Sequence, residues 1–156
     1  MFSLTNISIC SFTIFCVLQS YNCYRSGAPV RRCESMVPGH FAPAPSKPSP
    51  FELIPGKVIV NGSEVVQFTL SAENNETLKG FLIRLQAKNP IDEAEIHNMA
   101  NMGFFKISDE DAQIQKLDCF DVPSSAITHV SNVPKESLDF PWIAPRVDED
   151  TEFEVL

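Results

Sequence analysis

The chain has 156 residues, which suffice for one domain, and 44% of them are apolar, enough for a hydrophobic core. It carries 20 acidic and 12 basic side chains, for a formal net charge of −8. This balance argues against general nucleic-acid binding, which requires a basic surface. It also provides no electrostatic attraction toward anionic lipids.

The N-terminal segment resembles a secretory signal. The first 18 residues carry no charge, and their most apolar part is Phe12–Leu18. That length is typical of a signal h-region and is short for a membrane span. We therefore expect residues 1–20 to be a signal peptide with Ser20 at the cleavage position, and a secreted protein without stable membrane insertion once it is removed. A basic n-region is missing, and a signal anchor is the alternative.

Two features fit an oxidising compartment. Outside the predicted signal, three cysteines remain: Cys23, Cys33 and Cys119. In such a compartment cysteines far apart in the chain form disulfides, and the odd one is free, pairs between chains or is removed with the signal. Asn61 and Asn75 begin Asn-X-Ser/Thr sequons in predicted turns, so both are predicted glycosylation sites.

Residues 24–55 are predicted to form an irregular arm. Six of the 12 prolines lie between Pro38 and Pro55. Proline fixes φ and lacks an N–H donor, so this composition disfavours helices and central strands. Disorder is one interpretation, and an arm tied down across a folded domain is the other, which Cys33 near its start favours.

From residue 56 onward, short apolar runs alternate with turn signals, which indicates an antiparallel β-sandwich. Residues 89–102 are the least strand-like part and fit a helical turn or a loop. In the run at residues 78–87, Ile83 and Leu85 lie on one side of the expected strand, and Arg84 and Gln86 lie on the other. We predict an all-β sandwich of about eight strands over residues 57–60, 65–72, 78–87, 103–107, 114–120, 126–130, 137–143 and 151–156.

The stretch CESMVPGH, residues 33–40, allows three chemistries: a metal site, a thiol catalyst or a disulfide anchor. A metal site is not favoured, because His40, His97 and His129 are widely spaced and no HExxH or paired CxxC motif is present. Catalysis is not favoured either, since Cys33 has only His40 as a local base and no nucleophile-elbow or cofactor-binding motif occurs. We therefore predict no catalytic residue, cofactor or metal.

The anchor interpretation predicts a disulfide between Cys33 and Cys119. A proline-rich arm forms few ladder hydrogen bonds, so a covalent tether would prevent it from fraying. Closing so long a loop stabilises the fold by about 4 kcal/mol in the chain-entropy model. Trp142 follows an alternating run, which favours a place in the core over an exposed ligand platform.

Several of these pieces, taken in order, resemble the reeler domain, the module at the amino end of reelin and F-spondin. It also occurs in ferric-chelate-reductase-like proteins and in small secreted insect defence proteins such as noduler. The resemblance covers about residues 24–155, and Cys23 is extra to the family pattern. The similar pieces are Ser26–Pro29, Cys33–His40, Pro55–Val60, Lys79–Ala87, Gly103–Phe105, Cys119, Ala126–Val130 and Phe140–Pro145.

The resemblance implies an immunoglobulin-like sandwich and the Cys33–Cys119 bond. By analogy with the insect proteins, it implies a non-catalytic role in innate immunity through binding of microbial cell-wall or envelope components. Given the acidic balance, local clusters such as Arg25, Arg31 and Arg32, or apolar pockets, would have to carry the binding. The alternatives are an extracellular-matrix or adhesion module, and an N-terminal piece of a reductase-like membrane protein, which a truncation at Leu156 would fit. The ligand and the oligomeric state stay open, including pairing of Cys23 between chains.

Overall fold

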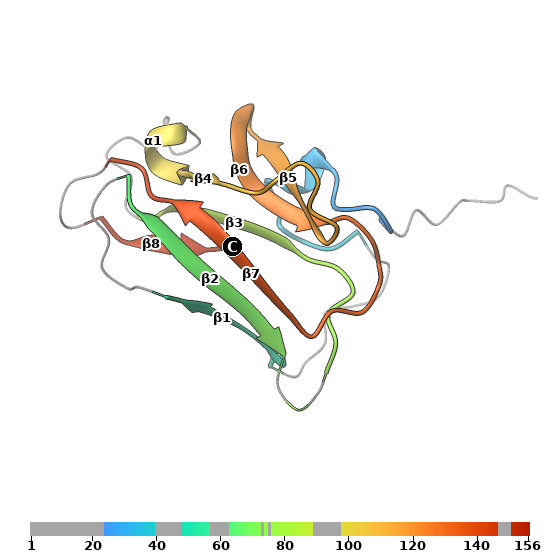
Figure 1. Ribbon diagram of the computed structural model, residues 1–156. Coiled ribbons are helices and arrows are strands. Elements are labelled where there is room, and N and C mark those ends of the chain that lie inside the picture. Colours follow the sequence, from blue (N-terminus) through green and yellow to red (C-terminus); the bar gives the residue numbers. More distant parts are fainter. Residues whose placement is uncertain are drawn as a thin grey trace, which may run out of the picture.

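The computed structural model describes residues 24–39, 48–56, 63–72, 74, 76–88, 98–146 and 151–156. Within these ranges two antiparallel sheets stack into a sandwich (Figure 1). The same ranges contain the 3₁₀ helix η1 (Val30–Arg32) in the arm and the one-turn helix α1 (Met99–Met102). The predicted signal peptide, Cys23, the strand at residues 57–60, and Asn61 and Asn75 lie outside the described residues, as do His40 and His97.

The first sheet has the strand order β1-β2-β7-β4. Its central pair is β2 (Val65–Ala72) and β7 (Ser137–Ile143), and its edges are β1 (Phe51–Pro55) and the short β4 (Phe104–Phe105). In the central pair Phe68 lies opposite Phe140, and Val66 lies opposite Trp142. Alternate residues along β2 and β7 therefore turn large apolar side chains toward the second sheet.

The second sheet has the order β5-β6-β3-β8, with β5 (Ile114–Cys119), β6 (Val122–His129), β3 (Leu82–Ala87) and β8 (Phe153–Val155). Its register places Ile83 opposite Ile127, and the β5–β6 ladder is interrupted by an irregularity between Leu117 and Cys119. The predicted all-β sandwich is thus confirmed. Each strand pairs antiparallel to its neighbours, and the sequence-distant β8 completes the sheet against β3.

The main core fills the space between the sheets. Phe68, Phe105, Phe140 and Trp142 are buried there and pack ring against ring, with centroids 5.8 to 6.3 Å apart. The Trp142 indole is 2% exposed, and its Nε1–H donates to the carbonyl of Met102 at 3.0 Å. Trp142 is therefore a core residue, as the alternation around it predicts, and not an exposed platform.

The strand β1 differs from the prediction, because Phe51–Pro55 lies within the range assigned to the irregular arm. Phe51 and Leu53 pack partly buried against the main core, which favours an extended backbone despite the surrounding prolines. Pro55 is tolerated because it is the last residue of an edge strand, where a missing N–H costs little. The sandwich therefore begins before residue 56.

The second sheet is buried on both faces, which the period-two pattern did not predict. Arg84 and Gln86 project away from Ile83 and Leu85, as expected, yet they are only 3% and 9% exposed. A second apolar cluster covers this outer face; it consists of Cys33, Met102, Cys119, Val122 and Ala126, with Leu82, Leu117 and Phe120 packed against it. The arm and α1 contribute to this cover, so the polar residues of β3 do not reach solvent.

Replacing Trp142 with Phe is predicted to destabilise the fold. The change leaves the buried Met102 carbonyl without its donor and removes part of the packed ring system, which together should lower the free energy of unfolding by about 2–4 kcal/mol. Urea unfolding followed by circular dichroism measures this. Phe104→Leu, at a partly buried position, is the control, and an unchanged midpoint for Trp142→Phe would show that the indole is not a core element.

Candidate binding site between the arm and the second sheet

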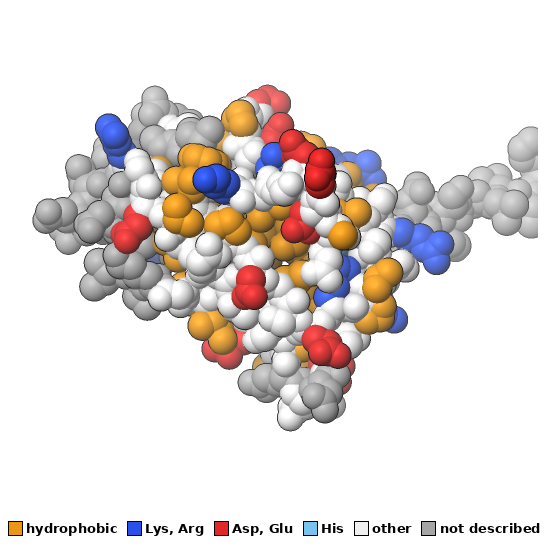
Figure 2. Space-filling view, in the orientation of Figure 1, with side chains coloured by type: hydrophobic (Ala, Val, Ile, Leu, Met, Phe, Trp, Pro, Cys, Tyr) orange, Lys and Arg blue, Asp and Glu red, His pale blue; other side chains and the backbone are white. Residues whose placement is uncertain are grey.

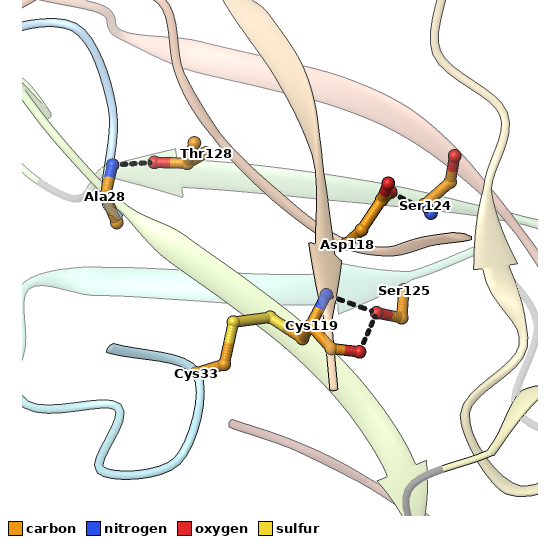
Figure 3. The surroundings of a disulfide bond; sticks show 7 residues. All are labelled: Ala28, Cys33, Asp118, Cys119, Ser124, Ser125 and Thr128. Carbon is orange, nitrogen blue, oxygen red and sulfur yellow. Dashed lines mark hydrogen bonds between the residues drawn. A yellow bond between two sulfur atoms is a disulfide. The ribbon is translucent and has the colours of Figure 1, made fainter. Parts of the chain in front are cut away.

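The N-terminal arm is joined covalently to the outer face of the second sheet. Cys33, directly after η1, forms a disulfide with Cys119 at the end of β5, across 86 residues of sequence and with 5.6 Å between the two Cα atoms (Figure 3). Both cysteines are essentially buried. The Ser125 hydroxyl accepts from the Cys119 N–H at 3.0 Å and donates to the Cys119 carbonyl at 3.1 Å, so the tip of the β5–β6 hairpin is fixed around the bond.

Hydrogen bonds extend the attachment along the arm. The Ala28 N–H donates to the Thr128 hydroxyl at 2.9 Å, and that hydroxyl donates to the Phe81 carbonyl at 2.6 Å (the first is drawn in Figure 3). Gln115 Nε2 donates to the carbonyls of Ser26 at 2.6 Å and His129 at 2.9 Å. These side chains from β5 and β6 replace the ladder that a proline-interrupted arm lacks.

The imidazole of His129 links three backbone segments. Its Nδ1 accepts the Phe81 N–H at 3.1 Å, and its Nε2 lies 2.8 Å from the Tyr24 carbonyl. Nδ1 is therefore the unprotonated nitrogen and Nε2 carries the proton that it donates to Tyr24. Gly80 allows this arrangement, because a Cβ there would lie 2.9 Å from the His129 ring. His129 is thus a structural histidine at the junction of arm and sheet.

Two arginines of η1 converge on Tyr24. The Arg31 guanidinium lies over the Tyr24 ring, 5.4 Å from its centroid, and donates to its hydroxyl. Hydrogen bonding from Arg32 lowers the pKa of Tyr24, and Arg31 adds to this lowering. Gly39 makes room for the group, since a Cβ there would lie 2.7 Å from both Arg32 and Tyr24. The end of the CESMVPGH stretch is therefore folded back onto the start of the arm.

A cavity of about 230 Å³ lies between the arm and the sheet. Its apolar lining comes from both partners and consists of Ala28, Met36, Val37, Pro38, Phe81 and Leu82. Its polar lining consists of Tyr24, Arg32, Lys79, His129 and Asn132. Such a space exists only while the disulfide and the hydrogen bonds hold the arm in place.

The charges of the cavity are opposite in sign to those of the chain as a whole. Arg32 and Lys79 line it, and no carboxylate is among its described lining residues. The Arg32 Nε is buried and has no hydrogen-bond partner among the described residues. By contrast, Figure 2 shows acidic and basic side chains dispersed over the face that it presents. The cavity is thus suited to an acceptor or an anion.

The described residues hold no group of three or more His, Cys, Asp or Glu side chains that converge on a point. None of the described helices is long and apolar enough to cross a membrane. The described lining of the cavity offers cationic and apolar contacts.

The predicted ligand surface of three arginines is divided by the structure. Arg32 lines the cavity, Arg31 is exposed over Tyr24, and Arg25 is exposed outside the lining. Sequence reasoning missed Lys79 and Asn132, which reach the same cavity from loops before β3 and after β6. No local signal marks them, because only the folded arm brings them together.

The fold and the site define a two-sheet β-sandwich whose N-terminal arm is fixed by a disulfide to one sheet, with a cavity beneath the arm. The family model of the Reeler domain matches residues 31–155, and the chain belongs to this family. The expected resemblance is thereby confirmed.

Relatives of two kinds are similar to the chain. The "Putative defense protein 2" of Antheraea mylitta is 26% identical over 78% of this chain and 71% of its own length. The "Putative defense protein Hdd11-like" of Samia ricini is 26% identical over 85% and 75%. The "Putative ferric-chelate reductase 1" of Danio rerio is 28% identical over 78% of this chain but only 20% of its own length.

Among solved structures, the reeler domain of human F-spondin is similar in fold. It has a TM-score of 0.52 and 21% identity, with 69% of this chain and 72% of that chain covered. This likeness supports the sandwich architecture.

Replacing Thr128 with Val is predicted to loosen the arm. The isosteric change removes the hydroxyl that bridges Ala28 and Phe81, leaving a part-buried N–H and a carbonyl unpaired, at a cost of about 1–3 kcal/mol. Hydrogen exchange at the Ala28 amide and urea unfolding measure the effect. Thr69→Val, which removes an exposed hydroxyl bonded to Asp139, is the matched control and should cost under about 1 kcal/mol. Equal losses in the two variants would contradict a special role for Thr128.

Proposed function

We propose that the protein is a secreted, non-catalytic defence protein that binds microbial surface components. The observation that carries this proposal is the similarity to proteins named as defence proteins, which spans 78–85% of this chain and 71–75% of theirs. A relation over most of both chains favours a shared role more strongly than a match to one part of a larger protein.

The arm is the part of the protein that we expect to contact the microbial surface. Arg25 and Arg31 are exposed, and Arg32 lies beside them at the cavity. Because the chain is acidic overall, a local cationic surface of this kind is what allows attraction to anionic groups of a microbial envelope. The disulfide and the paired sheets provide a rigid support for that surface.

The same residues support the proposed non-catalytic role. The cavity brings together cationic and apolar side chains, and its one histidine has both ring nitrogens engaged with backbone groups. Neither nitrogen is available to activate a nucleophile while the arm is in place. A catalytic cysteine is also disfavoured, because Cys33 and Cys119 are consumed in the disulfide.

Retention on microbial cells tests the proposal. We expect the purified protein to sediment with washed bacterial or fungal cells, and the double variant Arg25→Gln/Arg31→Gln to be retained about three- to tenfold less, since exposed charges each contribute modestly. Lys106→Gln/Arg146→Gln, two other exposed cations, changes the net charge equally and is the matched control.

Retention no greater than that of an unrelated acidic β-sandwich would contradict the proposal. Preferential binding to host matrix or host cell surfaces would favour the adhesion alternative instead. Equal loss in both double variants would show that retention depends on net charge and not on the arm.

A further inference from the structure

The cavity under the arm combines three features that together specify a ligand. Part of the lining is apolar, with Met36, Val37 and Pro38 from the arm and Phe81 and Leu82 at the start of β3. Two cationic side chains, Arg32 and Lys79, belong to the same lining. A lining that is hydrocarbon on one part and cationic on another is complementary to a molecule with an apolar chain and an anionic head.

The Arg32 guanidinium provides an independent indication of an anion. Its Nε is buried without a hydrogen-bond partner, although a buried donor is costly to leave unpaired. Among the described residues, the ion pairs are Lys88–Glu152 and Lys116–Asp109, so neither Arg32 nor Lys79 is neutralised by a carboxylate there. An oxyanion would supply the missing acceptor and the missing charge together.

The volume sets the size of the ligand. The volume of about 230 Å³ is many times the roughly 10–15 Å³ that one water molecule needs, so the space takes a chain of several carbons. This volume is below the range typical of drug-sized ligands. A short hydrocarbon chain therefore fits this space, with its head group at the cationic side chains.

We propose that this cavity binds a small amphipathic anion, with a short hydrocarbon chain between Met36 and Phe81 and a carboxylate or phosphate head at Arg32 and Lys79. The inference deepens the proposed function, because it names the ligand class of the same site. Acyl chains with anionic heads occur both as free acids and as parts of lipids, and the chemistry that the cavity recognises is common to them.

Calorimetric titration of the full chain with matched eight-carbon probes tests the inference. Octanoate and octyl phosphate carry the anionic head, 1-octanol has the same chain without charge, and octylammonium has the opposite charge. Because a hydrogen bond to a charged group contributes more than a neutral one, we expect the anions to bind at least about tenfold more tightly than 1-octanol. Comparison of octanoate with octyl phosphate then shows which head is preferred. Equal affinity for octanoate and 1-octanol, or no binding of either anion, would overturn the inference.

Variants at the exposed residues Lys79 and Val37 locate the site without endangering the fold. Lys79→Gln removes a cation at an exposed residue and should weaken octanoate about threefold, while Val37→Trp should block the cavity and abolish binding of every probe. Arg32→Gln should weaken octanoate about tenfold or more. Arg146→Gln, an exposed arginine outside the lining, should leave it unchanged. Undiminished octanoate binding in both Lys79→Gln and Val37→Trp would place the ligand elsewhere and overturn the assignment.

The cell assay tests the proposed function and the titration tests the ligand class, so one can fail without the other. Anion-selective binding that depends on Lys79 and Val37 in a protein that does not sediment with cells would refute the proposed function and leave the ligand class standing. Sedimentation with cells in a protein indifferent to octanoate and octyl phosphate would do the reverse.

Discussion

The disulfide between Cys33 and Cys119 is the constraint on which the rest of the site depends. An arm without a ladder of its own has little to hold it against a sheet, and its entropy favours release. Closing the 86-residue separation removes much of that freedom from the unfolded chain, which contributes about 4 kcal/mol in the chain-entropy model. The hydrogen bonds from Thr128, Gln115 and His129 then fix the orientation of a segment that the disulfide has already brought near.

The attachment of the arm also determines what the second sheet can do. It buries the outer face, so that Arg84 does not reach solvent. The Arg84 guanidinium carbon lies 5.1 Å from the centroid of the Phe120 ring. Burial lowers the pKa of Arg84. Near the start of β3, the arm and the sheet do not pack fully against each other, and the cavity lies between them beside Phe81 and His129. A cationic site in a chain of net charge −8 is therefore a local product of the folded arm.

The sequence predicted the sandwich and the core well, because alternation along residues 65–72 and 137–143 directly encodes which side chains face inward. It failed where burial depends on distant segments: β1 forms despite the prolines because its apolar residues find the core, and Arg84 is buried because the arm covers it. For the same reason, the sequence predicted only some of the residues that line the cavity. Met36 to Gly39 stand in one motif, whereas Lys79 and Asn132 join them through tertiary structure alone.

Hydrogen exchange of the arm amides, with the disulfide intact and after its selective reduction, tests this account most directly. We predict that the amides of Ala28, Arg32 and Met36, each bonded in the folded arm, lose their protection on reduction, while the paired amides of β2 and β7 keep theirs. Arm amides that stay protected after reduction would show that the covalent bond does not hold the arm. A free thiol at Cys33 in the folded protein would contradict the account outright.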